Sequence, residues 1–389
     1  MPNHKLEPEY EELRRTVREF AQDVVAPKIG GYYEQGEFPY DIVREMGRMG
    51  LFGLPFPEEY GGMGGDYFAL CLALEELARV DSSVAITLEA GVSLGAMPVY
   101  RFGSEEQKRE WLPRLCSGEL LGAFGLTEPE AGSDAGGTRT TARYDQATDE
   151  WVINGTKCFI TNSGTDITGL VTVTAVTEDQ ESSPARSISS IIVPSGTPGF
   201  TVAPKYSKVG WSASDTHELS FSDCRVPAAN LLGERGRGYA QFLRILDEGR
   251  IAIAALSTGL AQGCVDESVR YAGQRRAFGR PIGANQAIEF KLADMETRTH
   301  LSRLAWWDAA SRMSAGEPFK KEAAMAKLFS SDAAVTNARE ATQIHGGYGF
   351  MNEYPVARFW RDCKILEIGE GTSEVQRMLI ARQLGLAAS

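Results

Sequence analysis

One acidic residue near the C-terminus, Glu370, has neighbours that suit a general base. It lies between two glycines and directly before Thr372 and Ser373, either of which could cap a helix, with Gln376 as a capping-box partner of Ser373. Glycines adopt backbone conformations that other residues avoid, so we expect Glu370 to project from a sharp loop. Such a loop can present a carboxylate to a closed pocket, but the same pattern is typical of an acidic surface turn. Both interpretations stay open on these residues alone.

The composition predicts a soluble globular protein. The chain has 389 residues, 43% of them hydrophobic and 24% charged, which is enough for two or three packed domains. The net charge of −12 and the absence of long Lys/Arg runs disfavour nucleic-acid binding. The six cysteines form no C-x-x-C pair, and the four histidines are far apart in sequence, so we expect a reduced compartment without a disulfide framework or a metal site.

The sequence shows no targeting segment. It starts without an apolar signal region, and no stretch approaches the roughly 18 apolar residues that a membrane span needs. We therefore expect a bacterial cytoplasmic protein, although a processed chain of the mitochondrial matrix would have the same features.

The first third of the chain has helical periodicity. From Tyr10 to Val25 apolar residues recur every three or four positions, which predicts an amphipathic helix. Further helices are expected over 41–49, 67–80, 83–102 and 105–116. The last of these has Ser104 as its predicted N-cap and Gln107 as the capping-box partner.

The middle of the chain has the pattern of strands. Two runs, 151–153 and 157–161, flank Asn154-Gly155, which predicts a β-hairpin with a type I′ turn. Other strands are expected over 168–176, 186–193 and 217–221.

The helical pattern then returns to the end of the chain. Long helices are expected over 239–272, 285–314 and 317–344, with a last one after Thr372, and their short connections suit an antiparallel bundle. The predicted fold is therefore mainly α with an embedded β domain. The expected domains are an N-terminal helical domain (1–122), a central β domain (123–232) and a C-terminal helical bundle (233–389).

Five motifs follow one another along nearly the whole chain. They are Phe124–Asp134 (FGLTEPEAGSD), Asn154–Asn162 (NGTKCFITN), Arg275–Ile282 (RRAFGRPI), Gln343–Gly349 (QIHGGYG) and the loop that carries Glu370. Together and in this order they resemble the acyl-CoA dehydrogenase family. The resemblance implies an N-terminal helical domain, a central β-barrel-like domain and a C-terminal four-helix bundle, usually assembled as a homotetramer. It also implies FAD, an acyl-CoA substrate, and electrons passed to electron-transferring flavoprotein.

The resemblance implies cofactor roles for residues of the β domain. In the family the flavin ring lies against this domain, so that Leu126 and Thr127 would hydrogen-bond to it and Phe159 and Thr161 would lie along it. Ser133 would contact either the flavin phosphate or the substrate. Without the resemblance, Phe159 would be interpreted as a core aromatic and Ser133 as a turn hydroxyl.

A second set of cofactor residues is implied in the bundle. The Arg of the Arg-x-x-Phe-Gly motif reaches the flavin pyrophosphate of a neighbouring subunit in the family, and guanidinium geometry suits phosphate. The residues assigned to this inter-subunit site are Arg275, Phe278, Gln286, Gln343, Gly346 and Gly347, with Thr372 and Glu374 on the adenosine half. The resemblance thus implies that FAD binding and oligomerisation are linked.

The chemistry that the resemblance implies gives Glu370 the role of base. It would remove the α proton of the acyl group while flavin N5 accepts the β hydride, and burial would raise its pKa towards the working pH. Some branched-chain members carry the base immediately before the residue that matches Arg250, but this chain has Gly249 there. Glu248 is one residue off, a rotation of about 100° on a helix. The implied substrate contacts are Ser133, Asp247, Arg250 and Gly371; for Arg250, a surface charge is the alternative.

One position departs from the family pattern. Well-known straight-chain members have Tyr immediately before the base, whereas this chain has Gly369. The smaller residue leads to the hypothesis that the protein accepts branched or bulky acyl groups. The motifs scarcely separate a dehydrogenase from an acyl-CoA oxidase, and a non-catalytic flavoprotein of the same fold is a further alternative. Nitroalkane oxidation is disfavoured, because in the family it uses Asp at the base position.

Overall fold

The computed structural model describes residues 6–177 and 187–386, and it begins with a group of packed helices. They are α1 (Pro8–Phe20), α2 (Ala26–Gln35), α3 (Tyr40–Arg48), α4 (Tyr67–Ala78), α5 (Ser82–Glu89), α6 (Met97–Phe102) and α7 (Glu105–Cys116), with π-helical turns at Ala21–Val25 and Ala90–Ala96. Every residue of α4 and α5 is buried, as expected of helices that are apolar on all sides. The predicted capping box of Ser104 and Gln107 is confirmed.

The prediction that no stretch of the chain is long and apolar enough to span a membrane was wrong. The helical stretch Ser82–Phe102 has 21 residues and a mean hydropathy of 1.3, so it is long and apolar enough to cross a bilayer. However, 94% of its 18-residue apolar segment is buried inside the protein, as expected of a core helix. A core helix and a membrane span share this composition, and burial distinguishes them here.

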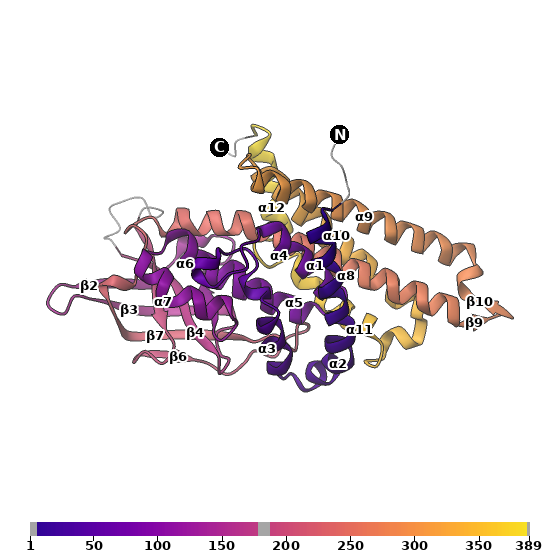
Figure 1. Cartoon of the computed structure of the whole chain (residues 1–389), viewed down its shortest axis with the longest axis horizontal. Coiled ribbons are helices and arrows are strands. Elements are labelled where there is room, and N and C mark those ends of the chain that lie inside the picture. The colour runs from indigo at the N-terminus through magenta and orange to yellow at the C-terminus, as the bar shows by residue number, and fades with distance from the viewer. Residues whose placement is uncertain (1–5, 178–186, 387–389) are drawn as a thin grey trace.

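A mixed sheet follows the first helices and lies at one end of the molecule (Figure 1). Its strands are β1 (Leu121–Gly125), β2 (Thr141–Asp145), β3 (Glu150–Thr161), β4 (Thr168–Val176), β5 (Ile188–Pro194), β6 (Phe200–Val202), β7 (Thr216–Pro227) and β8 (Leu231–Leu232). The order is β6-β7-β3-β2-β4-β5-β8, and β1 pairs in parallel with β4. The predicted strands over 168–176 and 217–221 are confirmed; the start of the one over 186–193 lies outside the described residues.

The predicted hairpin at Asn154-Gly155 was wrong, because both flanking runs belong to the single strand β3. Two bulges interrupt its pairing with β7. At the first bulge the Asn154 side chain accepts a hydrogen bond from the backbone N–H of Asp223 at 2.8 Å, so this asparagine supports an irregularity of the neighbouring strand instead of a turn. At the second, Phe159 has a φ of 62°, which turns its side chain out of the regular alternation.

Five helices make up the C-terminal part of the chain. They are α8 (Gly238–Gln274), α9 (Gln286–Ser314), α10 (Lys320–His345), α11 (Pro355–Leu366) and α12 (Ser373–Gln383). The short pair β9 (Arg276–Ala277) and β10 (Arg280–Pro281) protrudes between α8 and α9, at the end of the molecule opposite the sheet (Figure 1). The three long helices were predicted within a few residues, whereas α11 was missed.

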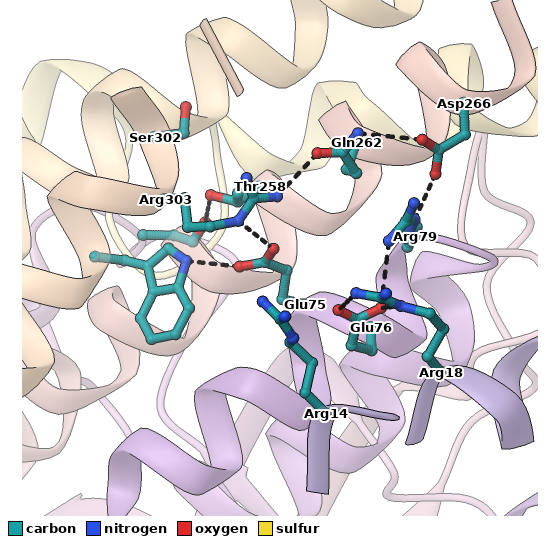
Figure 2. Close-up of polar contacts among 12 residues, drawn as sticks. Arg14, Arg18, Glu75, Glu76, Arg79, Thr258, Gln262, Asp266, Ser302 and Arg303 are labelled. Atoms are coloured by element: carbon teal, nitrogen blue, oxygen red, sulfur yellow. Dashed lines mark hydrogen bonds and ion pairs between the residues drawn. The ribbon is translucent and has the colours of Figure 1, made fainter. Parts of the chain in front are cut away.

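Buried ion pairs join the N-terminal helices to the bundle (Figure 2). Glu75 on α4 accepts hydrogen bonds from Arg303 at 2.7 Å and Trp306 at 2.9 Å, both on α9. The adjacent Glu76 accepts two bonds from Arg18 on α1, at 2.8 and 2.6 Å. Buried carboxylates are tolerated only with such partners, so this network fixes how α4 lies on the bundle. That placement positions α5, which contributes to the site described next.

Candidate active site

The loop between α11 and α12 holds Glu370 in an unusual backbone conformation. Glu370 has a φ of 54° and Gly371 a φ of 93°. The left-handed region costs a non-glycine residue on the order of 1–2 kcal/mol, so the loop must be held by its surroundings. Such strain concentrates at functional sites and supports the choice of Glu370 over a surface turn.

Two side chains brace the loop from behind. Gln376 donates hydrogen bonds to the backbone oxygens of Glu370 at 3.4 Å and of Gly371 at 2.8 Å. Lys327 on α10 donates to the same Gly371 oxygen at 2.9 Å. The capping prediction needs correction here: Thr372 is the N-cap and accepts from Val375 at 3.3 Å, so Gln376 lies one position too late to complete a capping box.

The carboxyl group of Glu370 lies over Gly249 of α8. A Cβ atom at Gly249 would lie 2.2 Å from Glu370 Oε2, so only glycine leaves this space free. Both carboxyl oxygens are buried, and no N–H group of a described residue donates to them. Burial raises the pKa of Glu370 to about 7, although Glu89, Arg250 and Lys327 act in the opposite direction.

Arg250 is part of this site and not a surface charge. It is 3% exposed, and it pairs with Asp247 one helical turn earlier on α8. Its Nε is buried and has no hydrogen-bond partner among the described residues. The rival acid Glu248 is also buried but pairs with Arg101 of α6 at 3.2 Å.

Glu89, the last residue of α5, was missed by the sequence reasoning. It is completely buried, and its carboxyl lies close enough to that of Glu370 for each to act on the pKa of the other. A possible signal was its position as a lone acid in the apolar run 84–92. Lys327 was missed in the same way, as a lone cation among the small residues of α10.

The predicted flavin-ring residues lie where the sheet meets α5 and α8. Leu126 and Thr127 follow β1, and their backbone oxygens accept from Lys157 Nζ at 3.1 Å and from the Cys158 N–H at 2.8 Å. Phe159 is 65% exposed, so its interpretation as a core aromatic was wrong. Thr161 is the last residue of β3. The side chain of the next residue, Asn162, donates a hydrogen bond to the backbone oxygen of Thr87 at 3.0 Å, and Thr87 lies two positions before Glu89 on α5. Ser133 is exposed on the loop between β1 and β2.

The predicted inter-subunit residues form a separate group at the other end of the bundle. A cavity of about 490 Å³ there is lined by Tyr271, Arg275, Ile282, Ile344, His345, Gly346, Gly347, Tyr348 and Met351. Arg275 lies over the Tyr348 ring and forms no ion pair with any residue that the structure describes. Around the cavity Phe278, Gln286 and Gln343 are exposed, and Phe278 has no covering from its own chain. Within one chain, the β9–β10 pair that adjoins this group lies at the end of the molecule opposite the sheet (Figure 1).

Thr372 and Glu374 lie on neither of these surfaces. Thr372 caps α12 and is half-buried, and Glu374 is exposed in the first turn of the same helix. They are therefore grouped with the Glu370 loop and not with Arg275.

Three family models match successive parts of this chain. They are the acyl-CoA dehydrogenase N-terminal domain over residues 7–119, the middle domain over 123–224 and the C-terminal domain over 236–385. The probable acyl-CoA dehydrogenase YngJ of Bacillus subtilis is 50% identical over 382 residues, which cover 98% of this chain and 99% of that protein.

Two solved structures share the whole architecture. One is butyryl-CoA dehydrogenase from Megasphaera elsdenii, with a TM-score of 0.94 and 41% identity over 98% of this chain and 99% of that one. The other comes from work on the electron transferring flavoprotein of Acidaminococcus fermentans, with a TM-score of 0.95 and 40% identity over 98% of this chain and 99% of that one.

Proposed function

The chain belongs to the acyl-CoA dehydrogenase family, and from that premise we propose that it converts a short-chain acyl-CoA to the trans-2-enoyl-CoA with Glu370 as the base. The family makes the protein an oxidoreductase that acts on acyl-CoA. The observation that carries the choice of base is the carboxyl of Glu370, which is buried, receives no N–H donor from the described chain, and is held on a strained loop.

The electrostatics around Glu370 suit removal of an α proton. A pKa of about 7 leaves a substantial fraction of the carboxylate at neutral pH, yet makes it a far better proton acceptor than an exposed glutamate. Arg250 and Lys327 favour the ionised carboxyl, while the buried and unpartnered Nε of Arg250 is free to contact the substrate. Asp247 keeps Arg250 in place.

The backbone of the same loop offers a donor for the thioester oxygen. The N–H of Glu370 donates to no carbonyl within the described residues. A proton can leave the α carbon only if negative charge on the thioester oxygen is stabilised, and a fixed N–H does this without reorganisation. The hydrogen bonds from Gln376 and Lys327 to the adjacent carbonyl groups keep this N–H in place.

The residues present fit FAD, which family members carry as flavoproteins. Phe159 is exposed and Thr161 half-buried near the end of β3, which offers a surface for the ring. The open space at Gly346 and Gly347, and Arg275, which has no ion-pair partner in the described chain, suit a pyrophosphate. When bound, the flavin supplies the acceptor for the β hydride. Leu126, Thr127 and Ser133 would hold the ring side, and Phe278, Gln286, Gln343, Thr372 and Glu374 the remainder. Strand β3, which carries Phe159, and strand β9, which directly follows Arg275, lie at opposite ends of one chain. We therefore propose that each site borrows Arg275 from a second subunit of a homotetramer.

The space at Gly369 supports acceptance of small branched acyl groups as well as linear ones. A Cβ at this position would have only the Ile365 oxygen near it, at 3.5 Å. We predict that Gly369→Tyr lowers kcat/KM on isobutyryl-CoA more than on butyryl-CoA, because the ring fills the space beside Cα. The ratio of the two values for each protein measures this. An unchanged ratio would remove Gly369 as a determinant of substrate choice.

Electron-transferring flavoprotein is the proposed acceptor, in keeping with a neighbour that was studied with such a flavoprotein. The decisive experiment is anaerobic titration of the purified flavoprotein with a panel of acyl-CoAs. Bleaching of the flavin by a short-chain thioester is the expected result. A protein that binds no FAD, or one that no acyl-CoA reduces, would overturn the proposal. Peroxide release in air, compared with reduction of the flavoprotein partner, distinguishes a dehydrogenase from an oxidase.

A further inference from the structure

Glu89 is a fully buried acid to which the proposed reaction gives no role. It ends α5, where the helix passes into the π-helical turn Ala90–Ala96, and its side chain is 0% exposed. No Lys, Arg or His of the described ranges 6–177 and 187–386 forms an ion pair with it. A buried carboxyl without a counter-ion is costly as an anion, so it must stay neutral or share a proton. π-helical turns are frequent at functional sites.

The carboxyl of Glu89 faces the carboxyl of Glu370. The two groups are close enough to interact directly, because each side chain is among the causes of the other's pKa shift. No N–H group of the described chain donates to either of them, and the Ser93 hydroxyl is the other hydrogen-bonding group that acts on the pKa of Glu89. Two carboxylates have only acceptor atoms, so a hydrogen bond between them requires a proton on one of the two. Two carboxyls in contact also cannot both ionise.

The surroundings favour the proton on Glu89 over Glu370. Glu370 has two cations nearby, Arg250 of α8 and Lys327 of α10, and both favour its ionised form. The groups that face Glu89 from its neighbours offer no cation: Tyr67 and Cys71 of α4, and Ser93 of the π-helical turn. Ser93 hydrogen-bonds to Tyr67 at 2.9 Å. Burial and then the charge of Glu370 raise the pKa of Glu89 well above its usual range.

We propose that Glu89 stays protonated in the working enzyme and donates a hydrogen bond to the carboxylate of Glu370, which makes it a positioning residue for the base. This inference rests on the proposed function of Glu370. The bond aims one carboxylate oxygen at Glu89 and leaves the other for the substrate. It also favours the ionised form of Glu370, so that burial does not inactivate the base at neutral pH. During turnover the α proton moves to Glu370 and Glu89 keeps its own.

Two variants separate the hydrogen bond from mere packing. Glu89→Gln keeps a donor of the same shape, whereas Glu89→Leu removes it and keeps the volume. The rate of flavin reduction should fall at low pH as Glu370 becomes protonated. In Glu89→Leu we expect the midpoint of this fall, the acidic limb of the pH profile, to lie about one pH unit higher. At pH values below the midpoint this is about a tenfold loss of rate. The rate at high pH should recover, and Glu89→Gln should keep the limb of the unchanged protein.

The other outcomes decide against the proposal. Coincident profiles for all three proteins would show that Glu89 does not act on Glu370, and a downward move in Glu89→Leu would show that Glu89 is ionised and repels it. Equal losses at every pH would assign it a packing role. Glu248→Gln is the control, since this neighbouring acid pairs with Arg101 and its loss should leave the limb in place. Failure of the unaltered protein to be reduced by any acyl-CoA would instead be failure of the proposed function.

A spectroscopic measurement tests the proton directly, without turnover. At a pH above the ionisation of Glu370, the infrared difference between the unaltered protein and Glu89→Gln should contain the C=O band of a protonated carboxyl. Its presence supports the proposal even if Glu89→Leu does not fold. Its absence, with a carboxylate band in its place, would overturn it.

Discussion

At the scale of single residues, the absence of a side chain at Gly249 decides where a base can lie. The carboxyl of Glu370 occupies the space that a Cβ on Gly249 would take, at 2.2 Å from Oε2. A base at position 370 of the loop and a side chain at position 249 of α8 therefore exclude each other. The two positions considered for the base from the sequence, 249 and 370, would therefore place a side chain in the same space.

This exclusion predicts the effect of Gly249→Ala. The methyl group meets the end of a flexible side chain and not backbone, so the protein should fold and bind flavin while the carboxyl is displaced. A misplaced reacting group costs on the order of 10²-fold in rate. Stopped-flow reduction by butyryl-CoA measures the loss. Ala at an exposed position of the same helix, Arg244→Ala, is the control, and an unimpaired Gly249→Ala would refute the assigned position of the base.

The raised pKa of Glu370 predicts opposite effects on activity and stability. Glu370→Gln should keep its flavin and lose about 10²–10⁴-fold in reduction rate, the usual contribution of a general base.

The folded protein binds more protons than the unfolded chain between pH 4.5 and about 7, so ionisation of Glu370 destabilises the fold as pH rises through this window. Glu370→Gln has no such penalty and should be more stable above pH 7, by on the order of 3 kcal/mol. Thermal unfolding of both proteins from pH 5 to 8 checks this, and parallel curves would contradict it.

The residues that could be predicted from the sequence are those whose neighbours in the chain mark them. Glu370 was marked by its glycines, and Arg250 was tied to the site through the resemblance. Glu89 and Lys327 are remote in sequence from Glu370 and meet it only because α5, α10 and the loop pack together. Their roles depend on tertiary contacts, which no local pattern encodes.

At the scale of elements, the loop after α11 is held by the first turn of α12. Gln376 is fully buried and its amide donates to two backbone oxygens of the loop. The sequence suggested Gln376 as the capping-box partner of Ser373. Because the N-cap is Thr372, Gln376 is instead the fourth residue of α12. The hairpin at Asn154-Gly155 was predicted wrongly because a two-residue turn and a one-residue bulge favour the same residue types. The long helices were easier to predict because their apolar spacing extends over many turns.

The bracing role of Gln376 predicts a defect in Gln376→Leu. Leucine fills the volume but leaves the Glu370 carbonyl without this donor, which should lower the free energy of unfolding by about 1–3 kcal/mol. The strained φ of Glu370 should then relax, with a fall in the rate of flavin reduction. Chemical denaturation and stopped-flow measurements report the two effects. Gln383→Leu at the exposed end of α12 is the matched control, and equal behaviour of both variants would show that the loop holds itself.

At the scale of the whole molecule, the proposed cofactor residues are divided between two distant regions of one chain. Phe159 and Thr161 lie at the sheet, whereas Arg275 and Phe278 lie at the β9–β10 end of the bundle (Figure 1). Phe278 is completely exposed, and the cavity beside Arg275 opens at the surface of the chain. A site assembled from two copies accounts for both observations.

A shared site predicts that two inactive variants restore each other. In Arg275→Ala the loss of the pyrophosphate contact should weaken FAD binding, and Glu370→Gln should bind FAD without reacting. When both are co-expressed with different tags and the mixed oligomer is isolated, one of its sites combines Glu370 from the first chain with Arg275 from the second. Activity per oligomer should then exceed that of either parent by at least tenfold, because an intact base and an intact phosphate contact meet in one site. If each chain instead supplied its own Arg275, mixed oligomers would be no more active than the parents, and the sharing of the site between subunits would be refuted.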